Sequence, residues 1–124
     1  MIRIVGIERN QDPNREFILL QNQGSLRQLL RGCAVIPDSR CDLPCASGSM
    51  HLFADETQVV PGAFIMLHTG VGEPKWTVTR DGSRVYHAYM NRSSCVWEEV
   101  HGPLHVLGIQ HTYTERATQA LTLR

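Results

Sequence analysis

Two short stretches of the sequence carry residue types that could perform chemistry. The first runs from Cys41 to Cys45, separates its two thiols by three residues, and is followed by His51. Zinc in proteins prefers four tetrahedral ligands of thiolate or imidazole type. These three side chains are therefore a candidate zinc site that would need one more ligand. A Cys41–Cys45 disulfide in an oxidising compartment is a second reading, and free thiols are the one we expect.

The second stretch, Gly70 to Lys75, combines two glycines with the single lysine of the chain. A phosphate loop directs successive backbone N–H groups at the anion and continues into a helix. Pro74 has no N–H to donate, and the following Trp76 to Thr79 has the composition of a strand. The spacing also differs from the G-x-x-x-x-G-K-[ST] pattern of phosphate loops. We therefore predict a turn here, with Gly70 and Gly72 letting a strand leave its sheet.

The other reactive side chains show no local catalytic signature. A cysteine nucleophile needs a neighbouring base and an orienting group, and neither is recognisable along the chain. His101 and His105 flank a glycine–proline turn, which excludes the helical face that brings two imidazole ligands together; a polar strand face is the simpler reading. The acidic residues that could bind a cation, and that we expect at solvated edges instead, are Asp55, Glu56, Glu98 and Glu99. We assign no catalytic, cofactor-binding or metal-binding residue and expect no enzyme.

Length and charge set the next limits. A chain of 124 residues is the size of one domain, and such a domain buries roughly two thirds of its unfolded surface without help from disulfides or metal. Twelve basic residues balance twelve acidic ones, so no net positive field exists to attract a nucleic acid. A protein partner is favoured, and the oligomeric state is left open.

Targeting signals give a conditional answer about compartment. No apolar run approaches the roughly 20 residues of a membrane-spanning helix, and the N-terminus lacks the pattern of a signal peptide. Taken as a complete chain, the sequence predicts a cytoplasmic protein; as a fragment, its compartment is unknown.

Alternating polar and apolar residues between turns predict an all-β fold, either a sandwich or a barrel. The expected strands are 2–5, 16–22, 63–67, 76–79, 84–89, 104–107 and 109–114. Asp81-Gly82 predicts a hairpin turn because it supplies the positive φ that such turns need, and Gly108 predicts another. Val59-Val60-Pro61-Gly62 is expected to form the turn that precedes the 63–67 strand.

One segment has a helical pattern. Ser25 to Arg31 places leucines at i, i+3 and i+4 behind a serine cap, which predicts a single amphipathic turn. Gly32 and Pro37 leave little room for a longer helix, and an isolated turn is marginal in water.

The order of these elements resembles the lamin tail domain family over most of residues 1–114, with 115–124 as a tail or last strand extension. The matching residues are Ile18, Leu20 and Asn22 in one strand, Leu30-Arg31-Gly32, Phe53, Val59-Val60-Pro61-Gly62, Thr69-Gly70, and Val96-Trp97. Cys33 stands where the family commonly has tryptophan, Gly102-Pro103 replaces an expected glycine–aspartate, and 38–50 is a longer loop.

This resemblance implies an immunoglobulin-like β-sandwich that serves in binding, anchoring or scaffolding without catalysis. The alternatives are a zinc-binding variant that uses the 41–51 loop and, third, a small hydrolase. The resemblance also implies a core role for Trp97, and small buried or half-buried cysteines are expected at Cys33 and Cys95. Candidate contact residues, chosen because arginine and tryptophan are frequent interface anchors, are Trp76, Arg80, Arg84 and Arg92.

Overall fold

The structure is a computed structural model that describes residues 1–38 and 49–108. Within these ranges the fold is all-β and contains no helix. In chain order the strands are β1 (Ile2–Glu8), β2 (Phe17–Asn22), β3 (Gln28–Leu29), β4 (Ala34–Pro37), β5 (His51–Leu52), β6 (Gln58–Val59), β7 (Phe64–His68), β8 (Lys75–Val78), β9 (Arg84–Tyr89) and β10 (Leu104–Leu107). No helix in the described part of the chain is long and apolar enough to cross a membrane.

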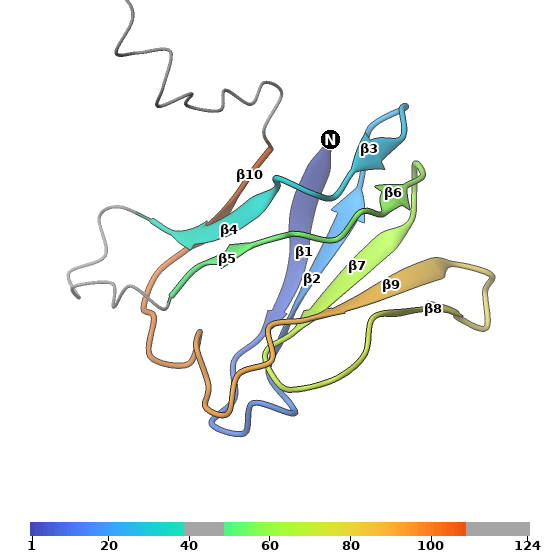
Figure 1. Cartoon of the computed structure of the whole chain (residues 1–124). Coiled ribbons are helices and arrows are strands. Elements are labelled where there is room, and N and C mark those ends of the chain that lie inside the picture. Colours follow the sequence, from blue (N-terminus) through green and yellow to red (C-terminus); the bar gives the residue numbers. More distant parts are fainter. Residues whose placement is uncertain (39–48, 109–124) are drawn as a thin grey trace, which may run out of the picture.

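The largest sheet has five strands in the order β1-β2-β7-β9-β8 (Figure 1). All its pairs are antiparallel except β7 with β9, which run parallel. After β7 the chain skips the neighbouring position in the sheet and forms β8. It then returns as β9, which fills the position between β7 and β8. This crossover places β8 at one edge of the sheet and β1 at the other.

A second layer covers one face of this sheet. It contains a three-stranded sheet in the order β10-β4-β5 and the short pair β3-β6 (Figure 1). The predicted all-β class is confirmed, and the layers have the arrangement of a β-sandwich.

Residues of alternate positions form the core between the layers, as period-two patterning requires. Ile18 and Leu20 on β2, and Ile65 and Leu67 on β7, have no exposed surface. From the other side come buried residues of the second layer and of the segment after β9, namely Leu30, Cys33, Val35, Phe53, Val96, Trp97, Val100 and Leu104. The predicted core role of Trp97 and burial of Cys33 are confirmed, and Cys95 is half-buried.

Two predicted turns are confirmed by backbone geometry. Gly82 has a φ of +88° in the β8–β9 turn, and Gly62 has a φ of +85° before β7. Both angles lie in the left-handed region, where glycine has no steric penalty. Asn22, fully buried at the end of β2, ties the Gly62 turn to the next loop, because its side-chain amide donates to the carbonyls of Val59 and Leu26, each at 2.9 Å.

The prediction of a helical turn over Ser25 to Arg31 is wrong. Gln28 and Leu29 form β3 and pair with Val59 and Gln58 of β6. The N–H of Leu30 also leaves the segment, donating to the carbonyl of Thr57 at 2.8 Å. Long-range pairing therefore satisfies the backbone groups that one helical turn would have left open. The strand expected at 109–114 and the turn expected at Gly108 fall at or outside the limit of the described residues.

A buried carboxylate fastens the segment after β9 to the main sheet. The side chain of Glu16 has no exposed surface. Its Oε1 accepts hydrogen bonds from Thr69 Oγ1 at 2.8 Å and from the N–H groups of Val96 and Trp97 at 2.8 and 3.0 Å. Its Oε2 accepts from the N–H of Glu98 at 2.9 Å. This carboxylate thus positions Trp97 over the core.

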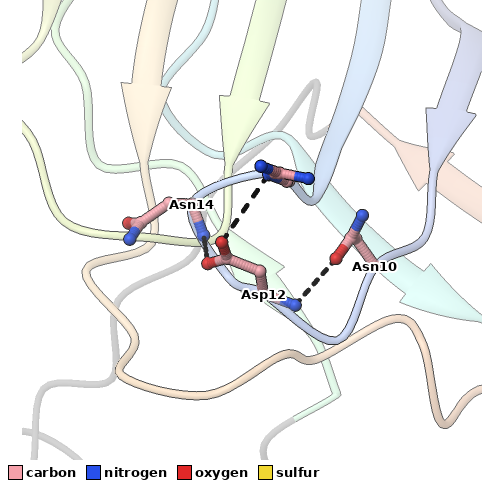
Figure 2. Close-up of polar contacts among 4 residues, drawn as sticks. Asn10, Asp12 and Asn14 are labelled. Carbon is pink, nitrogen blue, oxygen red and sulfur yellow. Dashed lines mark hydrogen bonds and ion pairs between the residues drawn. The ribbon is translucent and has the colours of Figure 1, made fainter.

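The loop that presents Glu16 is held by short-range side-chain bonds (Figure 2). Asn10 Oδ1 accepts from the N–H of Asp12 at 2.8 Å, and Asp12 Oδ1 accepts from the N–H of Asn14 at 2.9 Å. The carbonyl of Asp12 then accepts from the N–H groups of Arg15 and Glu16. These turns fix the position of Glu16 directly before β2.

Candidate functional site

The edge strand β8 offers main-chain groups with no partner strand among the described residues. In an antiparallel strand, the N–H and C=O of one residue point to the same side, and the side alternates from residue to residue. Thr79 donates its N–H to the carbonyl of Ser83 at 2.9 Å, continuing the ladder in which Thr77 pairs with Val85. The N–H and C=O groups of the odd-numbered residues of β8 therefore point toward β9. The N–H and C=O groups of Trp76 and Val78 face outward.

Two of the four side chains on this edge strand are large, apolar and exposed. Trp76 is 39% exposed and Val78 is 67% exposed. The guanidinium carbon of Arg84 lies 5.4 Å from the centre of the Trp76 ring, and the ring of Tyr86 lies 5.2 Å from it. We use the term β8 edge for the outward main-chain groups of Trp76 and Val78 together with the side chains of Trp76 and Val78. Figure 1 shows the position of β8 at the edge of the sheet.

The structure brings some of the predicted contact residues together. Trp76 and Arg84 are neighbours at the β8 edge, and Arg80 lies in the adjoining β8–β9 turn. Arg92 does not join them: it follows β9, and its N–H donates to the carbonyl of Thr69 at 2.9 Å. Val78, exposed at the C-terminal end of β8, was not among the predicted residues; its place two residues after Trp76 in an alternating strand is the signal that could have indicated it.

A polar network crosses the opposite face of the same strands. Thr77 Oγ1 lies 2.8 Å from His87 Nε2, and His87 Nδ1 lies 2.8 Å from His68 Nε2. The His68 ring stacks on Tyr89 with centroids 4.5 Å apart. The network joins β8, β9 and β7.

This alignment has the order of a hydroxyl nucleophile, a base and an orienting group. Its electrostatics oppose that chemistry. A catalytic base must become an imidazolium, whereas burial and the Lys75 charge lower the pKa of His87. The third member, His68, is an imidazole whose pKa is lowered to about 4, first by burial and then by the charges of His87 and Lys75. We therefore interpret the network as a tie that holds β8 in the sheet.

The same network predicts a loss of stability in acid. An unfolded histidine titrates near 6.5 and folded His68 near 4, so between these values the unfolded state binds more protons. The stabilising contribution is complete above about pH 6.5 and is lost as the pH falls toward about 4. We expect the free energy of unfolding, measured by denaturant titration, to fall over this range. His68→Asn should reduce that pH slope, and an unchanged slope would contradict the assignment.

The cysteine loop is tested only in part. Cys41 and Cys45 lie outside the described residues. His51 lies on β5, where its ring meets the edge of Phe53 with centroids 4.6 Å apart, and its Nε2 is buried without a hydrogen-bond partner in the described part of the chain. Burial lowers the pKa of His51.

The other candidate ligands are dispersed. Asp55 accepts a hydrogen bond from the Tyr86 hydroxyl at 2.7 Å, and Glu56 forms an exposed ion pair with Arg31 at 2.6 Å. His105 lies on β10, and its Nε2 is 3.5 Å from a carboxylate oxygen of Asp38. His101 lies before β10 in the chain. Across residues 1–38 and 49–108, no three His, Cys, Asp or Glu side chains form a group that could hold a metal ion.

Gly70 and Gly72 serve close packing in the turn between β7 and β8. A Cβ on Gly70 would overlap Asn14 of the loop in Figure 2, and one on Gly72 would overlap the Tyr89 ring. Lys75 is already part of β8, so a strand follows these glycines where a phosphate loop would continue into a helix. The predicted turn is confirmed.

Comparison with known proteins returned no matching family model, no matching curated protein and no matching solved structure.

Proposed function

We propose that this chain is a non-catalytic protein-interaction module that binds an extended segment of a protein at the β8 edge. Such binding adds a strand to the sheet, so that main-chain hydrogen bonds supply affinity and side-chain contacts supply selectivity. The observation that carries the proposal is the outward direction of the Trp76 and Val78 main-chain groups beside two exposed apolar side chains.

Natural sandwiches usually protect such an edge with charge, proline or a covering loop. Here Pro74 precedes the strand and Lys75 begins it, but Trp76 and Val78 follow without a further charge on the strand. Tryptophan and arginine are enriched among residues that dominate binding energy, and Arg84 rests on Trp76. The open edge is thus chemically equipped for recognition.

The resemblance to lamin tail domains supports the same role. We propose an immunoglobulin-like sandwich of that type, and three of the resembling residues, Asn22, Phe53 and Trp97, are buried as core positions of such a sandwich would be. Proteins of this family serve in binding and scaffolding, which agrees with a function located at an edge.

Selection of short peptides against the purified chain tests this function. We expect selected peptides to lose binding by about tenfold or more to Val78→Pro, which removes one outward N–H while leaving the ladder to β9. Val78→Ala keeps that N–H and should bind more tightly than the proline variant. Peptides that bind all three proteins equally would show that β8 is not the binding surface.

One observation favours the zinc-binding alternative. The buried His51 Nε2 has no hydrogen-bond partner among the described residues, and a zinc ion would satisfy it. Purified protein with near-stoichiometric zinc that is lost on Cys41→Ser, together with folding, would establish this alternative.

The hydrolase alternative rests on the Thr77–His87–His68 alignment. Turnover of ester substrates that His87→Asn abolishes would overturn the non-catalytic assignment. We expect no such turnover, because burial and, after it, the Lys75 charge lower the pKa of His87 and disfavour the imidazolium.

A further inference from the structure

We propose that the extended segment bound at the β8 edge is β8 of a second copy of this chain, paired antiparallel about a two-fold axis at Thr77. This inference rests on the proposed function and names its partner. The two five-stranded sheets would then form one continuous sheet, with the same surface used by both copies, as a two-fold dimer requires.

The direction of the main-chain groups selects this register. Only Trp76 and Val78 present outward N–H and C=O groups on β8. An axis at Thr77 pairs Trp76 of each copy with Val78 of the other, so that every outward group finds a partner. An axis at Trp76 would place Val78 opposite Pro74, which has no N–H. An axis at Val78 would place Trp76 opposite Arg80, in the turn beyond the strand.

Side chains are complementary in the same register. Trp76 and the opposing Val78 would lie on one face of the sheet, and aromatic with β-branched residues is a favourable cross-strand pair. Within one copy, Trp76 neighbours Tyr86 and Val78 pairs with Arg84. In the dimer, a row of side chains would therefore run from Tyr86 and Trp76 of one copy to Val78 and Arg84 of the other. The exposed side chains of Trp76 and Val78 would thereby be covered by the second copy.

The other face offers one pair of opposite charges, Lys75 and Asp81. The register places Lys75 opposite Thr79 of the second copy, in a pair without main-chain hydrogen bonds, where side chains approach most closely. The hydroxyl of Thr79 donates to the carboxylate of Asp81, so an anionic group lies beside Thr79. Hydrogen bonds from Thr79 and Ser83 lower the pKa of Asp81, which keeps it ionised. Two Lys75–Asp81 contacts would result, one on each side of the axis.

The two lysines remain apart. Lys75 of the two copies would be separated by four positions along the strands, about 13 Å, which exceeds the Debye length of about 8 Å at physiological ionic strength. The four-residue strand makes a short interface, so we expect a concentration-dependent dimer rather than a permanent one.

Sedimentation velocity of the full chain across a range of concentrations tests the dimer. We expect wild type to dimerise reversibly, and Val78→Pro and Val78→Lys to remain monomeric. Val71→Lys is the matched control: Val71 is 72% exposed, close to the 67% of Val78, but lies in the β7–β8 turn, and this variant should dimerise like wild type. Circular dichroism confirms that each variant is folded.

A charge exchange tests the register itself. Lys75→Asp and Asp81→Lys should each be monomeric alone, because like charges then face each other twice. Mixed together, they should form a heterodimer, since each contact again joins opposite charges. The double variant should recover the homodimer.

The outcomes separate the two proposals. A wild-type chain that stays monomeric at high concentration, or a dimer unaffected by Val78→Pro and by the charge exchange, overturns the self-pairing. If peptide binding at β8 nevertheless remains sensitive to Val78→Pro, the interaction module stands with a different partner. If no peptide and no second copy depends on Val78, both proposals fail.

Discussion

Glu16→Ala is expected to destabilise the fold by about 3–5 kcal/mol, because the change leaves buried donors without an acceptor. Three consecutive main-chain N–H groups, those of Val96, Trp97 and Glu98, bond to this one carboxylate, as does the Thr69 hydroxyl. With a total stability of roughly 5–15 kcal/mol for a domain, this is a large fraction. Denaturant titration followed by circular dichroism measures it.

Two variants serve as references for Glu16. Glu16→Gln preserves the shape and one acceptor oxygen, but it turns an amide donor toward donors, so it should be destabilised less than the alanine variant and clearly more than wild type. Glu56→Ala removes an exposed carboxylate paired with Arg31, a kind of contact that contributes about 0–1 kcal/mol. Equal stability of the Glu16 and Glu56 variants would contradict the role of Glu16.

Trp97→Ala is expected to cost about 3–5 kcal/mol through the cavity that a large buried side chain leaves. Trp97 has no exposed surface and is the largest of the fully buried side chains of the described residues. The same denaturant titration measures the loss, with Trp76 remaining as a fluorescent reporter.

Trp97→Phe separates packing from polarity at this position. The Trp97 Nε1 is buried without a hydrogen-bond partner among the described residues, so phenylalanine removes an unsatisfied donor while keeping much of the volume. We expect a smaller loss than for alanine, about 1–3 kcal/mol. A phenylalanine variant as unstable as the alanine variant would show that the indole N–H has a stabilising partner.

Local signals predicted several elements well. The strands at 84–89 and 104–107 have the predicted bounds, because alternation is strong there. The Asp81-Gly82 pair marked the turn before β9, and Gly82 has the positive φ that such a turn needs. In these places the conformation depends on neighbours in the chain, which a sequence displays directly.

Elements decided by distant partners were missed or misread. The leucine spacing of Ser25 to Arg31 indicated a helical turn, yet β3 forms because Gln28 and Leu29 pair with β6 about thirty positions away. The role of Glu16 depends on N–H groups 80 to 82 residues later. A single charged residue before an apolar run gives no local sign of such partners.

The candidate site was predictable in its residue types and not in its geometry. The residue types predict Trp76 and Arg84 as interface residues, but their contact requires the β8–β9 register. The edge position of β8 results from the parallel pairing of β7 with β9, which no turn signal in the sequence indicates. Because of that crossover, the main-chain N–H and C=O groups of Trp76 and Val78 point away from the sheet.

Amide hydrogen exchange, resolved by residue in dilute and concentrated samples, tests the β8 edge most directly. When the chain is dilute, Thr77 and Thr79 should exchange slowly, and Trp76 and Val78 rapidly. At high concentration, Trp76 and Val78 should become protected while Val71 does not change. Trp76 and Val78 amides that remain unprotected at every concentration, and also with a bound peptide, would contradict recognition through this edge.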